Sequence, residues 1–138
     1  GVSKNSIRDD NPPIVKVFLN DANFTNGGIS DPNPKIYSQI SDDFGINISG
    51  NSIGHDLTAI IDLNSQAPII LNQVYKSKLN NPKEGELYYP LKNLSPGKHT
   101  ITIIAWDISN NSGQGSLEFF VVDPVSYTHL TLPTSDLV

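Results

Sequence analysis

Cysteine is absent from this 138-residue chain. The sequence therefore offers no disulfide, no thiolate ligand for zinc and no thiol nucleophile. Small scaffolds that depend on disulfides are excluded, although the absence does not fix the cellular compartment. Methionine is missing too, and the only arginine is Arg8.

Basic residues are scarce: nine Lys and Arg stand against 14 Asp and Glu, giving a formal net charge of −5. Nucleic-acid-binding domains usually gather Lys and Arg on one face. The sequence contains no such cluster. We therefore exclude this class of protein and expect no nucleic-acid partner.

Long apolar runs are also missing. No stretch approaches the ~18–20 residues that a membrane-spanning helix needs, so we expect no transmembrane segment. The polar start, residues 1–11, lacks the apolar core of a signal peptide. We expect the chain to be a piece of a longer protein whose export signal lies upstream.

The apolar residues that are present follow a β pattern. No window has the helical spacing i, i+3, i+4, i+7, whereas short alternating runs are separated by Pro, Gly and Asn. Strands are predicted at residues 14–19, 35–41, 57–63 and 86–91, with shorter ones at 28–30, 69–71 and 74–79. Turns are predicted at residues 64–68, 80–85 and 92–97. This pattern predicts an antiparallel β-sandwich.

The clearest element is a hairpin near the C-terminal end. Its strands are residues 98–107 and 115–122, and the polar loop 108–114 contains Asn110, Asn111 and Gly113. We predict a linker at 1–12, the sandwich at 13–123 and a tail at 124–138. The tail resembles translated adaptor sequence and is expected to be non-native or disordered. The alternative is a genuine linker to another domain.

One face of this hairpin is more apolar than a solvated sheet requires. Ile101, Ile103 and Ala105 alternate on one side of the first strand, but the other side carries Ile104 and Trp106. We predict that Ile104, Trp106 and Phe120 form an interaction patch on the outer face. The alternative is that a loop, such as residues 20–34, covers them.

Residues 50–54 match the hydrolase pattern G-x-S-x-G around Ser52. A nucleophile elbow needs a helix after the serine, but a strand is predicted at 57–63. We therefore reject Ser52 as a nucleophile and predict no catalytic residue.

The adjacent Gly54, His55 and Asp56 are interpreted as a structural motif, in which Asp56 accepts a backbone N–H and His55 donates to a carbonyl. A metal role for His55 is the alternative, and it would need further ligands. The strand parity places His99 at the end of the sandwich, where we expect it to be partly buried and hydrogen-bonded.

Asp and Asn gather in several predicted loops. The groups are Asn20, Asp21 and Asn23; Asp42 and Asp43; and Asp107, Asn110 and Asn111. Their side chains favour turns, which is our interpretation. Calcium coordination would need six to eight converging oxygens and remains the alternative. We expect no cofactor.

Several short motifs follow one another in an order that resembles a known family. They are Asn20-Asp21-x-Asn23-Phe24, Gly27-Gly28-Ile29-Ser30-Asp31-x-Asn33-Pro34, Ser41-Asp42-Asp43-x-Gly45-Ile46-Asn47, Gly54-His55-Asp56-Leu57-Thr58-Ala59, Tyr89-Pro90-Leu91-x-Asn93-Leu94, Pro96-Gly97-x-His99-Thr100 and Ala105-Trp106-Asp107. Together they resemble the immunoglobulin-like region that follows the peptidase domain in PorU-type sortases. These sortases of the type IX secretion system of Bacteroidota belong to the gingipain-like cysteine peptidases.

The resemblance, which covers residues 12–122, implies an immunoglobulin-like sandwich of about seven strands in an enzyme on the cell surface, outside the outer membrane. In this family the enzyme removes the C-terminal signal of secreted cargo and attaches the cargo to an anionic lipopolysaccharide. A chain without cysteine cannot supply the nucleophile of that reaction, so no catalytic residue is carried over.

The resemblance therefore implies a non-catalytic accessory module that positions the peptidase or docks partners. The expected partners are its own upstream catalytic domain and an outer-membrane component of the secretion machinery. The alternative is a carbohydrate- or surface-binding sandwich of another secreted protein, for which Tyr37, Tyr75 and Tyr88 are available.

Overall fold

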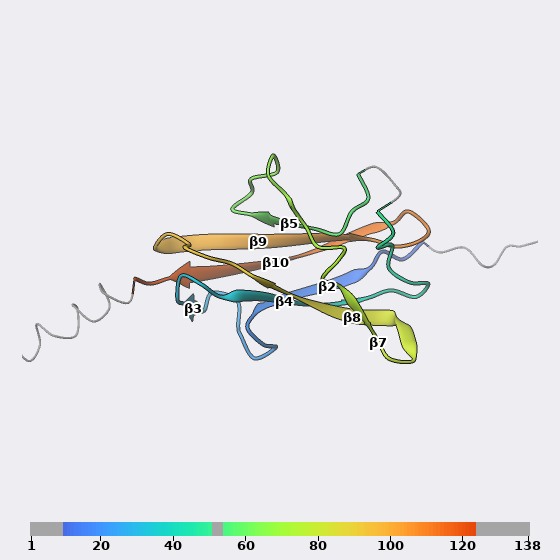
Figure 1. Cartoon of the computed structure of the whole chain (residues 1–138), viewed down its shortest axis with the longest axis horizontal. Coiled ribbons are helices and arrows are strands. Elements are labelled where there is room, and N and C mark those ends of the chain that lie inside the picture. Colours follow the sequence, from blue (N-terminus) through green and yellow to red (C-terminus); the bar gives the residue numbers. More distant parts are fainter. Residues whose placement is uncertain (1–9, 51–53, 124–138) are drawn as a thin grey trace, which may run out of the picture.

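The protein folds into two facing β-sheets in a computed structural model that describes residues 10–50 and 54–123 (Figure 1). The strands are β2 (Ile14–Leu19), β3 (Ile29–Ser30), β4 (Lys35–Ser41), β5 (Thr58–Ile61), β6 (Ile69–Ile70), β7 (Lys76–Lys78), β8 (Asn81–Pro90), β9 (Gly97–Trp106) and β10 (Ser112–Val121). Most of the predicted linker and the whole predicted tail lie outside the described residues.

The two sheets have four and five strands. The first has the order β2-β4-β8-β7 and is antiparallel throughout. The second has the order β3-β10-β9-β5-β6, and only its β3–β10 pair is parallel. The predicted all-β sandwich is confirmed. It contains nine strands rather than about seven, because short edge strands are added to each sheet. No helix occurs in the described residues, and none there could span a membrane.

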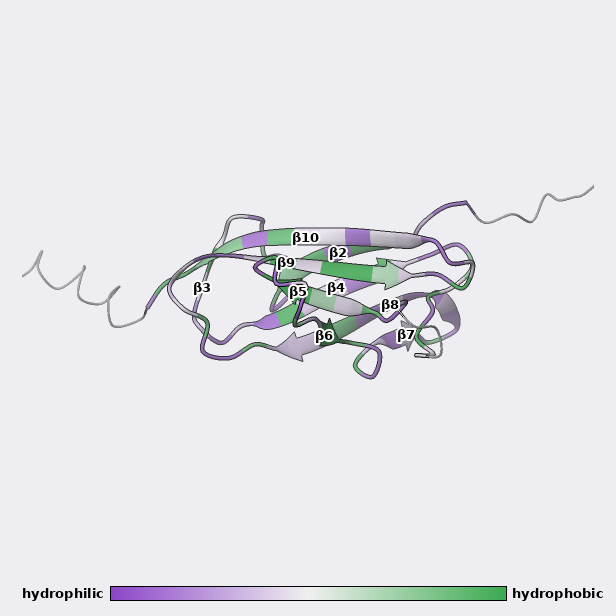
Figure 2. Ribbon diagram, turned by 90° about the horizontal axis from the view of Figure 1, so that it is seen from above, coloured by the Kyte–Doolittle hydropathy of each residue, from purple (hydrophilic) through white to green (hydrophobic). Residues whose placement is uncertain are grey.

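The core lies between the sheets and follows the predicted alternation. Ile101, Ile103 and Ala105 of β9 are fully buried, and Leu19 and Ile36 meet them from the opposite sheet. Burying each large aliphatic side chain contributes about 1.5–3 kcal/mol. In Figure 2 much of β9 is apolar, whereas the region around β7 is hydrophilic.

Glycines close one side of the sandwich. A Cβ added to Gly113 would overlap the carbonyl oxygen of Pro13, and one added to Gly115 would overlap that of Val15. The backbone of β2 therefore lies directly against β10, although the two strands share no ladder of backbone pairs. Only glycine leaves room for this contact.

The predicted turn at residues 80–85 is wrong. β8 already begins at Asn81, and the chain reverses at Leu79 and Asn80, where Asn80 has a φ of 64°. Gly85 is buried within the strand, and a Cβ there would overlap the Tyr75 hydroxyl. The glycine makes room for a core tyrosine and does not form a turn.

The third predicted strand ends earlier than expected. β5 stops at Ile61 because Asp62 and Leu63 have φ values of 54° and 63°, which lie in the left-handed region. The hairpin loop is also shorter than predicted, since β10 starts at Ser112. Asn110 provides its left-handed residue, with a φ of 69°.

Candidate functional site

An aromatic row crosses the outer face of the four-stranded sheet. Phe18, Tyr37 and Tyr88 stand opposite one another on β2, β4 and β8. The ring centroids are 5.8 Å apart for Phe18 and Tyr37 and 4.7 Å apart for Tyr37 and Tyr88. Lys35 Nζ lies 5.5 Å from the Tyr88 ring centroid, a cation–π contact.

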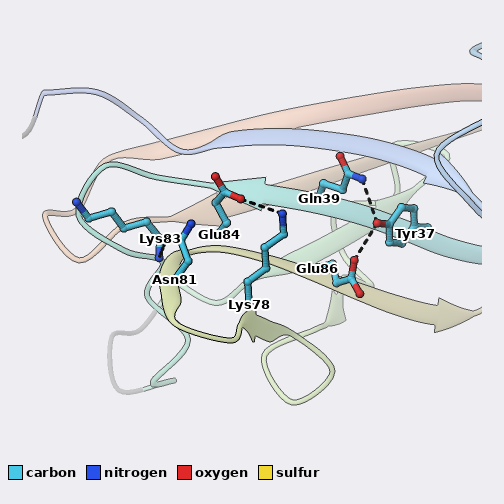
Figure 3. Close-up of polar contacts among 7 residues, drawn as sticks. All are labelled: Tyr37, Gln39, Lys78, Asn81, Lys83, Glu84 and Glu86. Atoms are coloured by element: carbon cyan, nitrogen blue, oxygen red, sulfur yellow. Dashed lines mark hydrogen bonds and ion pairs between the residues drawn. The ribbon is translucent and has the colours of Figure 1, made fainter.

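A polar row runs beside the aromatic one, with Lys16, Gln39, Glu86 and Lys76 in register across the four strands. Gln39 Nε2 donates to the Tyr37 hydroxyl at 3.0 Å, and that hydroxyl donates to Glu86 Oε1 at 2.9 Å (Figure 3). The hydrogen bond from Gln39 lowers the pKa of Tyr37, whereas burial and the neighbouring Glu86 raise it. The two raising effects together are larger, so the pKa is raised overall. Tyr37 therefore keeps its proton and acts as a donor.

A third row completes the face with Ile14, Ser41 and Glu84. Lys78 Nζ binds Glu84 Oε1 at 3.0 Å, and this bond raises the pKa of Lys78. The polar rows line a shallow groove of about 290 Å³, which we call the sheet groove. Its lining residues are Ile14, Lys16, Tyr37, Gln39, Ile40, Ser41, Lys78, Glu84, Gly85 and Glu86.

The charge of this face differs from that of the whole chain. Its residues include four lysines and two glutamates: Lys16, Lys35, Lys76, Lys78, Glu84 and Glu86. The face thus carries two net positive charges on a protein of net charge −5. The two carboxylates lie on β8, and the lysines lie on the other three strands of the sheet.

The three tyrosines that sequence analysis considered for carbohydrate binding do not share one site. Tyr37 and Tyr88 meet in the aromatic row, where Tyr88 is 44% exposed. Tyr75 is buried in the core, and burial raises its pKa to about 12. Sequence analysis missed Phe18, Gln39 and Glu86, because only the register of distant strands brings them to Tyr37.

The predicted patch residues lie at two ends of the other sheet. Ile104 and Trp106 are half-buried near the end of β9. Phe120 is 41% exposed and pairs with Lys98 near the start of that strand. Its neighbour on β3 is Ile29, which is 68% exposed. The structure therefore does not bring Phe120 to Ile104 and Trp106.

The half-burial of Trp106 has an identifiable cause. The His55 ring stacks on the Trp106 ring with centroids 3.8 Å apart and planes 9° apart. Asn47 N donates to Trp106 O at 2.8 Å, which anchors the same loop to the strand. The predicted covering loop at residues 20–34 is therefore not the segment on Trp106.

The Gly54, His55 and Asp56 motif is held differently from the prediction. Asp56 Oδ1 accepts from Asn72 Nδ2 at 3.2 Å, and Asn72 Oδ1 accepts from Leu57 N at 2.9 Å. The backbone N–H bond that was predicted for Asp56 is thus accepted by Asn72. His55 Nδ1 is buried and has no hydrogen-bond partner among the described residues. Ser52 lies outside the described residues.

His99 is buried and hydrogen-bonded, as predicted. Its Nδ1 lies 2.7 Å from Asp62 Oδ2 and its Nε2 lies 2.6 Å from Ser95 O. Burial lowers the pKa of His99, but the Ser95 and Asp62 contacts raise it by more, so the pKa is raised overall.

The carboxylates in the acidic loops accept hydrogen bonds from backbone N–H groups of their own turns, as the sequence predicted. Asp21 Oδ1 accepts from Asn23 N, and Asp42 Oδ2 accepts from the N–H groups of Phe44 and Gly45. Asp107 Oδ1 accepts from Ser109 N and Asn111 N. Within residues 10–50 and 54–123, no group of three or more His, Cys, Asp or Glu could hold a metal ion.

The fold and these faces define a class of protein: an all-β sandwich domain with one mixed aromatic and polar sheet face. No family model and no curated protein matches the sequence. Among solved structures, the chain is similar to a part of dimeric latent PorU from Porphyromonas gingivalis, with a TM-score of 0.78 and 34% identity. The match covers 84% of this chain and 11% of PorU.

A second structure, CopC from Methylosinus trichosporium OB3b, is far less similar. Its TM-score is 0.43 and its identity 18%, over 79% of this chain and 96% of CopC. The chain is therefore related to one domain of PorU and spans about a tenth of that protein.

Proposed function

We propose that this chain is a non-catalytic, immunoglobulin-like accessory domain of a type IX secretion sortase, displayed on the outer side of the outer membrane. The observation that carries the proposal is the 34% identity to one segment of PorU over 84% of this chain. The chain contains no cysteine. The thiol that removes the cargo signal, before attachment to anionic lipopolysaccharide, then belongs to an upstream peptidase domain.

The role that we propose for the domain is to dock and position that peptidase. Phe120 and Ile29 support this role, because they are adjacent, apolar and well exposed, and such surfaces mark contacts. Ile104 and Trp106 contribute less, since they are already half-buried. An outer-membrane component of the secretion machinery is the other partner that this surface would fit.

A domain exchange tests the proposal. Residues 13–123 replace the matching segment of PorU in P. gingivalis, and the mass of the secreted cargo reports removal of its C-terminal signal. We expect the chimera to process cargo, whereas a chimera carrying an unrelated sandwich in the same place does not. If both chimeras reach the cell surface and are equally inactive, the proposal is wrong.

The docking surface has its own variant and control. In the active chimera, Phe120→Ser is expected to lower cargo processing several-fold by weakening contact with the peptidase. Leu79→Ser is the matched control, because Leu79 is 90% exposed and lies in the turn between β7 and β8 of the other sheet, away from the pair. Equal effects of the two substitutions would contradict docking at Phe120.

A further inference from the structure

We propose that the sheet groove binds an uncharged saccharide unit, a hexose or N-acetylhexosamine, through Gln39 and Glu86. This site lies on the sheet opposite to Phe120. It does not depend on the relation to PorU, so either proposal can fail without the other.

The groove presents hydrogen-bonding groups that are already held in place. The relay from Gln39 through the Tyr37 hydroxyl to Glu86 uses one N–H of Gln39 and one oxygen of Glu86. Among residues 10–50 and 54–123, no hydrogen bond uses the Gln39 carbonyl, its second N–H or the other Glu86 oxygen. Because both residues are fixed by Tyr37, a ligand would lose little affinity to ordering them.

The spacing of these groups suits a sugar ring. Gln39 and Glu86 are register partners on adjacent strands, which lie about 4.8 Å apart. A donor–acceptor amide and a carboxylate at that spacing can bind neighbouring hydroxyls of one ring. The Lys16 ammonium, next in the same row, adds a donor on the β2 side.

Apolar surface borders the polar groups. Tyr37 is stacked between Phe18 and Tyr88 and lines the groove. Ile14, which is 61% exposed, lies at the other end. The C–H surface of a sugar can pack against both. At about 290 Å³ the groove is near the small end of ligand pockets, so we expect one unit to be bound.

The same features disfavour other ligands. Lys16 and Lys78 in the groove lining are balanced by Glu84 and Glu86, so the lining has no net positive charge with which to bind a phosphate group. An apolar peptide would bury the Lys78–Glu84 ion pair and would offer no hydrogen bonds in place of those that the pair makes with water. A hydroxyl-rich, uncharged ligand satisfies the free donors and acceptors without that cost.

An NMR titration of the full 138-residue chain tests the site. Mannose, galactose and N-acetylglucosamine are added separately, and the probes are the Gln39 side-chain amide and the backbone amides of β4 and β8. We expect at least one sugar to produce saturable shifts of these signals. Inorganic phosphate, added in the same way, should leave them unchanged.

Two substitutions and a matched control locate the binding. Gln39→Ala removes a donor and an acceptor and should weaken binding roughly tenfold. Glu86→Gln retains an oxygen for Tyr37 but removes the charge, and should also weaken it. Gln114→Ala, an exposed glutamine of β10 on the other sheet, should have no effect.

The proposal is overturned if none of the three sugars shifts the Gln39 amide. It is also overturned if binding of a sugar survives both Gln39→Ala and Glu86→Gln, or if phosphate alone produces the shifts. Folding of each variant is checked by the dispersion of the same spectra.

Discussion

A histidine ring lies at each end of β9, but the two rings are held in different ways. At the start of the strand, His99 is buried between Asp62 and Ser95 and contacts an acceptor with each ring nitrogen. At its end, Trp106 is covered by His55, whose buried Nδ1 has no hydrogen-bond partner within residues 10–50 and 54–123. His99 is held by directional, charged contacts, whereas the Trp106 ring is covered by flat ring packing.

This difference has a chemical consequence. The carboxylate of Asp62 and the carbonyl of Ser95 both accept hydrogen bonds, so the His99 ring satisfies both only when each nitrogen carries a proton. Asp62 also accepts from Thr100 N at 2.8 Å, which ties the left-handed turn after β5 to β9. The Trp106 end needs no proton, because stacking requires only two flat rings.

The largest effect is expected from Asp107, which closes the Trp106 end. It is fully buried, and it accepts from Ser109 N, Asn111 N and Asn111 Nδ2 at 2.9, 2.8 and 3.0 Å. Asp107→Ala should lower the free energy of unfolding by about 3 kcal/mol, because it strands buried donors. Urea denaturation measures the change.

Asp62→Ala is the matched substitution at the other end of β9. The Asp62 side chain is 45% exposed, so water can replace part of its bonding and the expected loss is about 1–2 kcal/mol. A larger loss for Asp62→Ala than for Asp107→Ala would reverse the ranking of the two ends.

The second-largest expected effect is a pH dependence of stability that comes from the His99 end of β9. The pKa of His99 is raised in the folded protein, so its stabilising contribution is complete below the unfolded-state pKa of about 6.5. The contribution is lost as pH rises through the higher folded-state pKa. We expect the free energy of unfolding to fall over this range above about pH 6.5.

His99→Gln should remove this pH dependence and cost about 1 kcal/mol at mildly acidic pH. His55→Gln is the control at the other end, and should leave the slope of stability against pH in place. Denaturation curves measured across this pH range test the prediction. If His99→Gln leaves the slope of stability against pH unchanged, protonation of this residue is contradicted.

The smallest effect is expected at His55. His55→Phe keeps a flat ring on Trp106 and removes a buried nitrogen without a partner, so stability should be unchanged or rise by up to about 1 kcal/mol. His55→Ala should instead expose Trp106 and shift its fluorescence to longer wavelength. A marked loss of stability in His55→Phe would show that the nitrogen, rather than the stacking, matters.

The alternation of side chains made the sandwich and much of its core predictable. Ile101, Ile103 and Ala105 are buried as their parity indicated, because burial on one face of a strand is a local property. Gly85 was misinterpreted, since its sequence neighbours indicate a turn and its real reason, the Tyr75 ring, is ten residues away.

Most of the candidate site could not be predicted from the sequence. Phe18, Tyr37 and Tyr88 come from three strands, and periodicity assigns each a face without giving its neighbours across the sheet. The same holds for Gln39 and Glu86, whose link through Tyr37 depends on register. The covering of Trp106 by His55 was also not predictable, because irregular loops follow no period.

The glycine contact between β2 and β10 has a mechanical consequence. Pro13 lies against Gly113 and Val15 against Gly115, so the two strands run in the same direction. The chain accordingly enters the sandwich at one end and leaves at the other (Figure 1). Tension between neighbouring domains would pull these strands lengthwise past each other. They share no backbone ladder, so resistance to extension would rest on the hydrogen bonds that join β2 to β4 and β10 to β9.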